Sequence, residues 1–148
     1  DWWVHGDLAS KDKDGHWFLH GRSDDTIKVS GKRIGPSELE SVIVKSGKAK
    51  EVAAVGIPDE NKGSKIILSI VLLENSEEKE SYFENLVIND LGKSFKPDKI
   101  IFVKDLPKTR NMKIMRRVIK SCLTKEDPGD ISTLLNPESV EEIRAHAI

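Results

Sequence analysis

The chain has 148 residues, of which 33% are charged, yet its 24 Lys and Arg almost balance its 25 Asp and Glu. This length suits one domain, or one domain with a short arm. The near-neutral balance excludes a strongly basic protein that binds nucleic acid or a membrane through its overall charge. Only a local cluster of charge could serve such a partner.

The composition also limits the compartment and the chemistry. A single cysteine, Cys122, can form neither an intrachain disulfide nor a cysteine-based zinc site, so we expect a reducing, cytoplasmic location. The histidines lack metal-ligand spacing, and we expect no metal site. No segment approaches the roughly 18 apolar residues of a membrane span, so no membrane contact is expected.

The chain starts with Asp1-Trp2-Trp3-Val4 and has no initiator Met. These residues are typical of the middle of a protein sequence and not of its natural start, and no signal-peptide pattern is present. We therefore expect the sequence to be a piece of a longer protein.

Two hairpins are predicted in the first part of the chain. The sequence DKDG at 12–15 supplies a tight turn between two apolar stretches. Residues 26–33 read TIKVSGKR, in which apolar and polar positions alternate up to a turn at Ser30-Gly31.

Beyond the hairpins, helical and strand patterns alternate. Ser37 and Glu40 form a predicted capping box for a helix that ends at Gly47. Further helices are predicted from 76–80 to 91, around 115–122 and from 137 to about 145, with strands at 52–57, 65–73 and 99–103. The most apolar of these, 65–73, is the expected central strand. The predicted fold class is α+β: a small sheet with hairpins and packed helices.

The stretch KTRNMKIMRR at 108–117 contains five cations in ten positions. It could be a nucleic-acid patch, a solvated helix face, or a loop that presents one lysine to a phosphate. Arg116, Arg117 and Lys120 fall off the apolar stripe of the following helix, which favours a solvated face for them. Lys113 precedes that helix, and its compact, mobile ammonium group suits a phosphoryl ligand. Nucleic-acid binding would call for interleaved aromatic residues, whereas all three Trp lie in the first 17 residues.

Other candidate residues have an ordinary and a functional interpretation. Asp7 follows Gly6, where it is either a turn residue or a carboxylate for two ribose hydroxyls. Arg22 lies beside Asp24, which predicts either a surface ion pair or a phosphate-binding arginine next to a hinge. Gly31 and Arg33 form either a plain hairpin turn or a place where a ligand approaches the backbone beside a phosphate-binding cation.

Several long motifs, in order, resemble the C-terminal part of the AMP-forming acyl-CoA synthetases, and among them most the acetyl-CoA synthetases. They are GDLA (6–9), DKDGHWFLHGRSDDTIKVSGKRIGPSELES (12–41), VGIPDENKG (55–63), PDKIIFVKDLPKTRNMKIMRR (97–117) and GDISTLLNPESVEEI (129–143). The resemblance covers essentially the whole chain.

The resemblance implies an enzyme that activates a carboxylic acid with ATP and Mg²⁺ to an acyl-AMP, and then transfers the acyl group to coenzyme A. Residues 1–23 would end the large N-terminal domain. Residues 24–148 would form a lid that rotates between the two half-reactions. The fragment alone should be inactive, because the ATP loop and the acyl pocket lie upstream in the family.

Matching positions imply a role for each candidate residue. Asp7 and Arg22 would bind the nucleotide, Asp24 would be the hinge, and Lys113 would be the catalytic lysine of the first half-reaction. Gly31 and Arg33 would contact coenzyme A in the second half-reaction. A lysine acetyltransferase and deacetylase are implied partners, because acetylation would remove the charge of the catalytic lysine.

Two positions depart from the family pattern. Asn111-Met112 replaces the Ser-Gly that precedes the catalytic lysine, so the loop must differ or tolerate strain. Ile88, in LVINDLG, stands where relatives carry an arginine that meets coenzyme A. The alternatives are the lid of another adenylate-forming ligase, for a medium-chain or aromatic acid, a stand-alone interaction domain, and a basic nucleic-acid-binding module.

Overall fold

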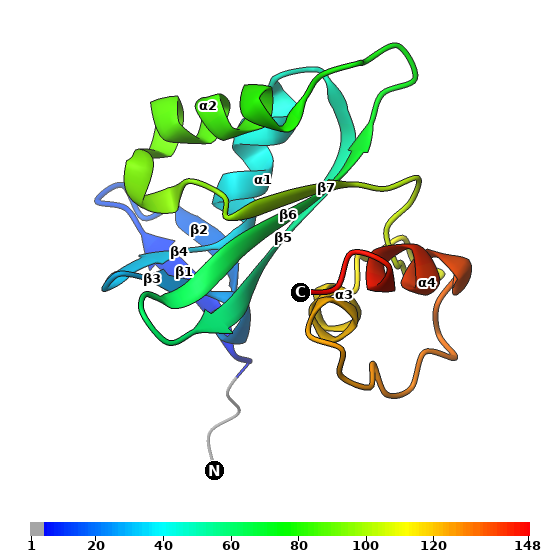
Figure 1. Ribbon diagram of the computed structural model, residues 1–148. Helices are drawn as coiled ribbons and strands as arrows, with labels where there is room; N and C mark the ends of the chain where they lie inside the picture. Colours follow the sequence, from blue (N-terminus) through cyan, green and yellow to red (C-terminus); the bar gives the residue numbers. More distant parts are fainter. Residues whose placement is uncertain (1–4) are drawn as a thin grey trace.

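Figure 1 shows the computed structural model, which describes residues 5–148; the expectations for the first four residues lie outside this range. The elements are β1 (Asp7–Lys11), β2 (Trp17–Arg22), η1 (Ser23–Asp25), β3 (Ile27–Val29), β4 (Lys32–Ile34), α1 (Pro36–Lys45), β5 (Ala49–Asp59), β6 (Gly63–Leu72), α2 (Glu80–Leu91), η2 (Lys93–Phe95), β7 (Lys99–Phe102), α3 (Arg116–Leu123) and α4 (Glu138–Arg144). This mixture of strands and helices confirms the predicted α+β class.

The central sheet has the order β5-β6-β7. Strand β6 pairs antiparallel with β5, in register Val55 with Ile67, and parallel with β7, in register Ser69 with Ile101. The prediction of a central strand in the most apolar run is therefore confirmed. Both of its faces are covered by helices, which explains why residues 66–71 are all buried and do not alternate with polar residues.

Each face of the sheet carries its own core (Figure 1). Helices α1 and α2 cover one face, where Leu39, Ile43 and Phe83 pack against β6 residues such as Leu68. Helices α3 and α4 cover the other face. The predicted stripe of α3 is confirmed there, because Val118, Ile119 and Cys122 are fully buried and Met115 packs against this core.

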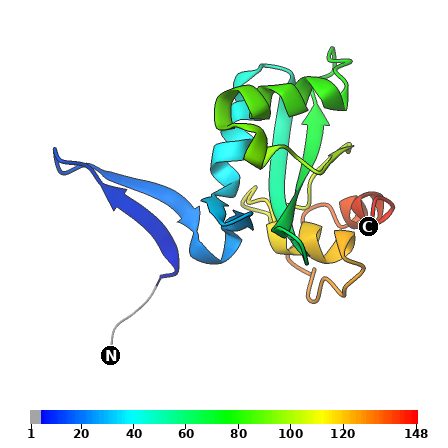
Figure 2. The same cartoon turned by 60° about the vertical axis from the view of Figure 1, so that its left-hand side comes forward.

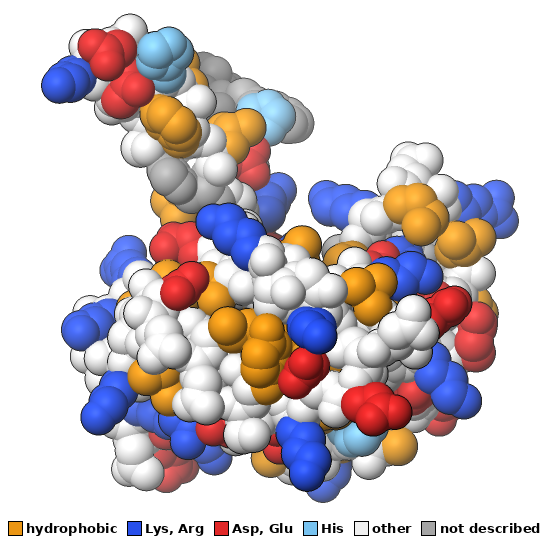
Figure 3. Space-filling model, turned by 90° about the horizontal axis from the view of Figure 1, so that it is seen from above, with side chains coloured by type: hydrophobic (Ala, Val, Ile, Leu, Met, Phe, Trp, Pro, Cys, Tyr) orange, Lys and Arg blue, Asp and Glu red, His pale blue; other side chains and the backbone are white. Residues whose placement is uncertain are grey.

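The strands β1 and β2 form the first predicted hairpin, and β3 and β4 form the second. Figure 2 shows the β1–β2 hairpin extending away from the sheet and helices as an arm. Large hydrophobic side chains on this arm are exposed to solvent, namely Leu8, Trp17, Phe18 and Leu19. In Figure 3 the arm again stands off from the body, and the surface is hollowed beside its base. The arm corresponds to the residues predicted to precede the lid, although the boundary at 23–24 stays a prediction.

Two local predictions were wrong. The capping box fails because α1 has Gly35 as its N-cap and no side-chain cap bond, and the Glu40 carboxylate instead accepts a hydrogen bond from Ala54 N–H at 2.9 Å. Strand β5 also runs beyond the predicted 52–57. It continues to Asp59, whose carboxylate accepts bonds from two successive backbone N–H groups and closes a tight turn into β6.

Candidate functional site

The segment that carries Lys113 is a small hairpin, which we call the lysine loop (residues 107–115). Lys108 and Ile114 form an antiparallel bridge. Nearer the tip, Thr109 N–H donates to the Lys113 carbonyl at 2.9 Å, and Met112 N–H donates to the Thr109 carbonyl at 2.8 Å. The loop backbone is thus fixed by hydrogen bonds, while the Lys113 side chain is exposed to solvent.

Met112 occupies the turn position that normally belongs to glycine. Its φ is 62°, in the left-handed region. A three-residue hairpin tip needs one residue in this conformation, and glycine usually supplies it. The sequence predicted that the loop must differ or tolerate strain, and the structure keeps the turn with a strained methionine.

Several predicted residues meet in one hollow, which we call the lysine hollow. Arg22 and Asp24 from the end of the arm, and Lys113 from the lysine loop, all line it. Its volume is about 280 Å³, and the start of α1 and of α3 supply its remaining walls. Residues that are 91 positions apart in the sequence (22 and 113) are therefore brought to one place.

Asp7 and Arg22 are paired residues of the first hairpin. The Arg22 side chain is turned toward the hinge position, where its Nε donates to Asp24 Oδ1 at 3.0 Å. This hydrogen bond holds the pKa of Asp24 below its usual value. Both side chains are exposed, so the ion pair is easily exchanged for another anionic partner.

The predicted coenzyme A residues lie elsewhere. Arg33 lines a separate hollow of about 510 Å³ between the arm and the start of α1. Gly31 lies at the tip of the second hairpin with φ 80°, and an added Cβ there would meet no atom within 4 Å. The structure thus keeps these two residues apart from the lysine hollow. Ile88 lies in the last turn of α2, where its carbonyl accepts a bond from Gly92 N–H.

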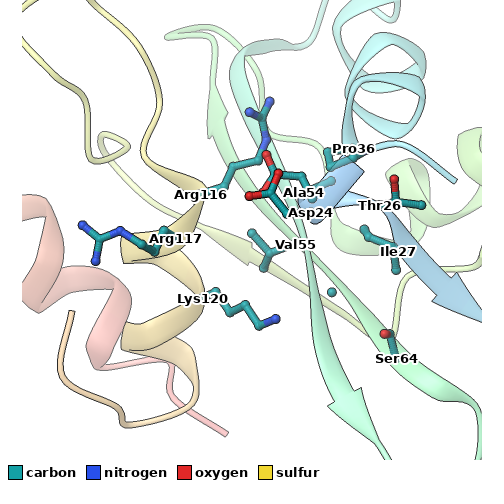
Figure 4. Close-up of a pocket in the computed structure, with 12 residues that line it drawn as sticks. Asp24, Thr26, Ile27, Pro36, Ala54, Val55, Ser64, Arg116, Arg117 and Lys120 are labelled. Atoms are coloured by element: carbon teal, nitrogen blue, oxygen red, sulfur yellow. The ribbon is translucent and has the colours of Figure 1, made fainter. Parts of the chain in front are cut away.

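The basic residues of α3 are not a uniform solvated face. Figure 4 shows a smaller hollow, of about 100 Å³, in which Arg116 and Lys120 reach toward β5 while Arg117 turns away. Arg116 forms a bidentate ion pair with Glu40, at 2.9 and 2.6 Å, and is only 26% exposed. The prediction of a solvated face is wrong for Arg116, because the carboxylate that neutralises it is on another element, 76 positions away.

The arrangement places exposed cations around an open hollow. Arg22 offers a planar fork for a phosphate or ribose, and Lys113 offers a mobile point charge. Within the described residues, no three His, Cys, Asp or Glu side chains come together to hold a metal ion. No helix of residues 5–148 is long and apolar enough to cross a bilayer.

Comparisons with known proteins identify the family of this chain. The family model described as AMP-binding enzyme C-terminal domain matches residues 38–113. The chain is 46% identical over 144 residues to acetyl-coenzyme A synthetase of Methanothrix thermoacetophila, and 43% identical over 150 residues to that of Pasteurella multocida. These alignments cover 95% and 97% of this chain but 22% and 23% of the relatives, so the chain spans less than a quarter of their length.

The chain is also similar in structure to solved proteins. ATP-bound MatB from Rhodopseudomonas palustris superposes with a TM-score of 0.74 and 27% identity, over 80% of this chain and 24% of that one. The anthranilate CoA ligase AuaEII in complex with anthranoyl-AMP superposes with a TM-score of 0.70 and 32% identity, over 79% and 23%.

Proposed function

Because this chain belongs to the AMP-binding enzyme C-terminal domain family, we propose that it is the lid of an AMP-forming acid–CoA ligase. The whole enzyme would activate a carboxylate with ATP to acyl-AMP and pass the acyl group to coenzyme A. The observation that carries this proposal is the meeting of Arg22, Asp24 and an exposed Lys113 around one open hollow.

Lys113 would act in the first half-reaction. As the carboxylate attacks the α-phosphate, negative charge grows on the phosphoryl oxygens and on the departing pyrophosphate. A cation placed there beforehand stabilises the transition state more than the ground state. The rigid backbone of the lysine loop supports this role, since it fixes the origin of the side chain while the ammonium group stays free to reach the ligand.

Asp7 and Arg22 would hold the nucleotide, and Asp24 would be the hinge of the lid. These roles are supported by the location of all three residues at the base of the arm, where η1 joins the arm to the second hairpin. We propose residues 1–23 as the end of a large N-terminal domain. The exposed hydrophobic side chains of the arm support this boundary, because a surface of this kind is normally covered.

Gly31 and Arg33 would serve the second half-reaction from a different face. The open space around Gly31 supports a close approach of a narrow ligand to the backbone, as the pantetheine arm requires. Arg33 would contact a phosphate of coenzyme A. A lid that rotates about Asp24 would present this face after Lys113 has withdrawn.

Acetate, or another short acid, is the proposed substrate, because the two curated relatives described above are acetyl-coenzyme A synthetases. A ligase for an aromatic acid is the second candidate, favoured by the likeness to an anthranilate CoA ligase. ATP, Mg²⁺ and coenzyme A are the proposed cofactors. A cytoplasmic location and regulation by acetylation of Lys113 are further proposals, the latter supported by the exposure of that side chain.

A nucleic-acid-binding module is disfavoured by the charges of the basic stretch. Lys108 is buried against two carboxylates and Arg116 is paired with Glu40. The five cations of residues 108–117 therefore do not form a continuous basic surface.

The test uses the full-length protein that contains this chain. Pyrophosphate release and CoA thioester formation would be measured with ATP across a series from acetate to aromatic acids. We expect release that depends on one short acid, and thioester only when coenzyme A is added. Absence of pyrophosphate with every acid would refute the proposed activity, and a preference for an aromatic acid would select the second candidate.

A further inference from the structure

A buried lysine lies at the base of the lysine loop, and no step above uses it. The Lys108 side chain is 7% exposed. Its Nζ donates to both carboxylate oxygens of Glu51, at 2.9 and 2.8 Å, and to Asp105 Oδ1 at 2.7 Å. Glu51 comes from β5 and Asp105 from the segment that enters the loop, so one ammonium group fastens the loop to the sheet.

The C-terminal segment completes this cluster through Asn136, which is also buried. Its Oδ1 accepts Lys108 N–H at 3.0 Å, while its Nδ2 donates to Asp105 Oδ2 at 2.6 Å and to the Leu106 carbonyl at 2.8 Å. One side chain, placed just before α4, thus satisfies three groups around the loop base. We call Lys108, Glu51, Asp105 and Asn136 the loop clamp.

The backbone adds a second link between this segment and the loop. Leu135 N–H donates to the Lys108 carbonyl at 2.8 Å, and Thr109 bridges Leu134. Residues 134–136 therefore lie against the loop strand that leads to Lys113. The family match ends at residue 113, so the part of the chain that supplies Asn136 lies outside it.

Two charged groups of the clamp, Lys108 and Asp105, favour their ionised forms. Burial favours the neutral form of Lys108, but its bonds to Asp105 and Glu51 outweigh this effect and raise its pKa above its usual value. Burial likewise opposes the charged form of Asp105, yet the bonds from Lys108 and Asn136 lower its pKa. Lys108 and Asp105 are therefore both charged near neutral pH.

A buried ionic cluster is seldom more stabilising than apolar residues of the same size. The loop clamp is therefore better explained by the precise geometry that it gives to the base of the lysine loop. Charge-assisted bonds fix distances and angles in a way that apolar contacts do not. Only four residues, Thr109 to Met112, separate Lys108 from Lys113. A displacement of the backbone at the base of this short hairpin therefore also displaces its tip.

We propose that Lys108 and Asn136 are positioning residues for Lys113, so that the C-terminal segment takes part in the first half-reaction by fixing the lysine loop. This inference rests on the proposed role of Lys113. It predicts that loosening the clamp slows adenylation and spares thioester formation, because only adenylation uses the loop tip.

The test compares variants of the full-length enzyme in both half-reactions. Asn136→Ala removes the clamp's link to the C-terminal segment without changing charge, and Lys108→Met removes its centre. Matched controls are Asn75→Ala and Lys50→Met, which alter exposed residues. Lys113→Ala is the reference, and urea unfolding checks that each variant is folded.

For Asn136→Ala we expect kcat of pyrophosphate release to fall by about 10- to 100-fold, the scale of an ångström-sized misplacement, with little change in KM for ATP. Thioester formation from supplied acyl-AMP should match the controls. Adenylation at the control rate in Asn136→Ala, or an equal loss in both half-reactions, overturns the inference even if Lys108→Met fails to fold. Unchanged adenylation in Lys113→Ala overturns the proposed role of that lysine, and the inference with it.

Discussion

Met112 is the residue at which the sequence and the backbone disagree most. Its left-handed conformation, at φ 62°, is one that an L side chain adopts at a cost of about 1–2 kcal/mol. The hydrogen bonds of Thr109 with Met112 and Lys113 hold the turn closed in spite of this cost. The glycine expected at this position allowed the sequence to predict that a methionine would be strained in this turn. It could not predict that the turn would form in spite of the strain.

Met112→Gly should therefore stabilise the chain by about 1 kcal/mol or slightly less, because the relief of strain exceeds the extra chain entropy that glycine loses on folding. Urea unfolding measures the difference. Met112→Ala keeps the strained angle and is the control, for which no gain is expected. A gain for alanine as large as that for glycine would show that strain at this position is not the cause.

Glu40 and Asn136 show, at the scale of elements, what local patterns cannot predict. Glu40 was predicted to cap a helix from its sequence neighbours, yet the side chains of both residues bond to distant segments: Glu40 to Arg116 on α3, and Asn136 to Lys108 and Asp105 of the loop clamp. A capping pattern considers only four residues at a time. A buried charge selects partners that the tertiary fold brings near, and these cannot be read from local spacing.

Glu40→Ala should lower the free energy of unfolding by about 3 kcal/mol, because it leaves Arg116 charged and only partly exposed. Loss of a helix cap would cost only about 1 kcal/mol. Glu38→Ala, at an exposed position in the first turn of the same helix, is the matched control and should cost well under that amount. In the Glu40→Ala background, a further Arg116→Met change should cost little; a full additive loss would contradict the ion pair as the cause.

The elements themselves were largely predictable, since their signals are local. Apolar periodicity located α3, and the run of residues 66–71 identified the central strand. Element ends were less predictable. Strand β5 extends to Asp59 because the side chain of that residue builds the turn, whereas the sequence predicted a strand that ends at residue 57.

At the scale of the whole molecule, the residues proposed for the two half-reactions lie in two separate places. The lysine hollow contains Lys113, Arg22 and Asp24, whereas Gly31 and Arg33 lie outside it. The motif resemblance predicted these residues, but no local pattern could indicate that they would separate into two groups. In the proposed function, rotation of the body relative to the arm at η1 would replace Lys113 by Gly31 and Arg33, since η1 joins the two parts (Figure 2).

The proposed role of Lys113 is tested most directly by assaying the Lys113→Ala variant of the full-length enzyme separately in the two half-reactions. Pyrophosphate release from acid and ATP should fall by roughly 10²–10³-fold or more, because a preorganised positive charge is lost from the transition state. Thioester formation from supplied acyl-AMP and coenzyme A should continue at the unmodified rate. An equal fall in both half-reactions, or no fall in adenylation, would contradict the role assigned to Lys113.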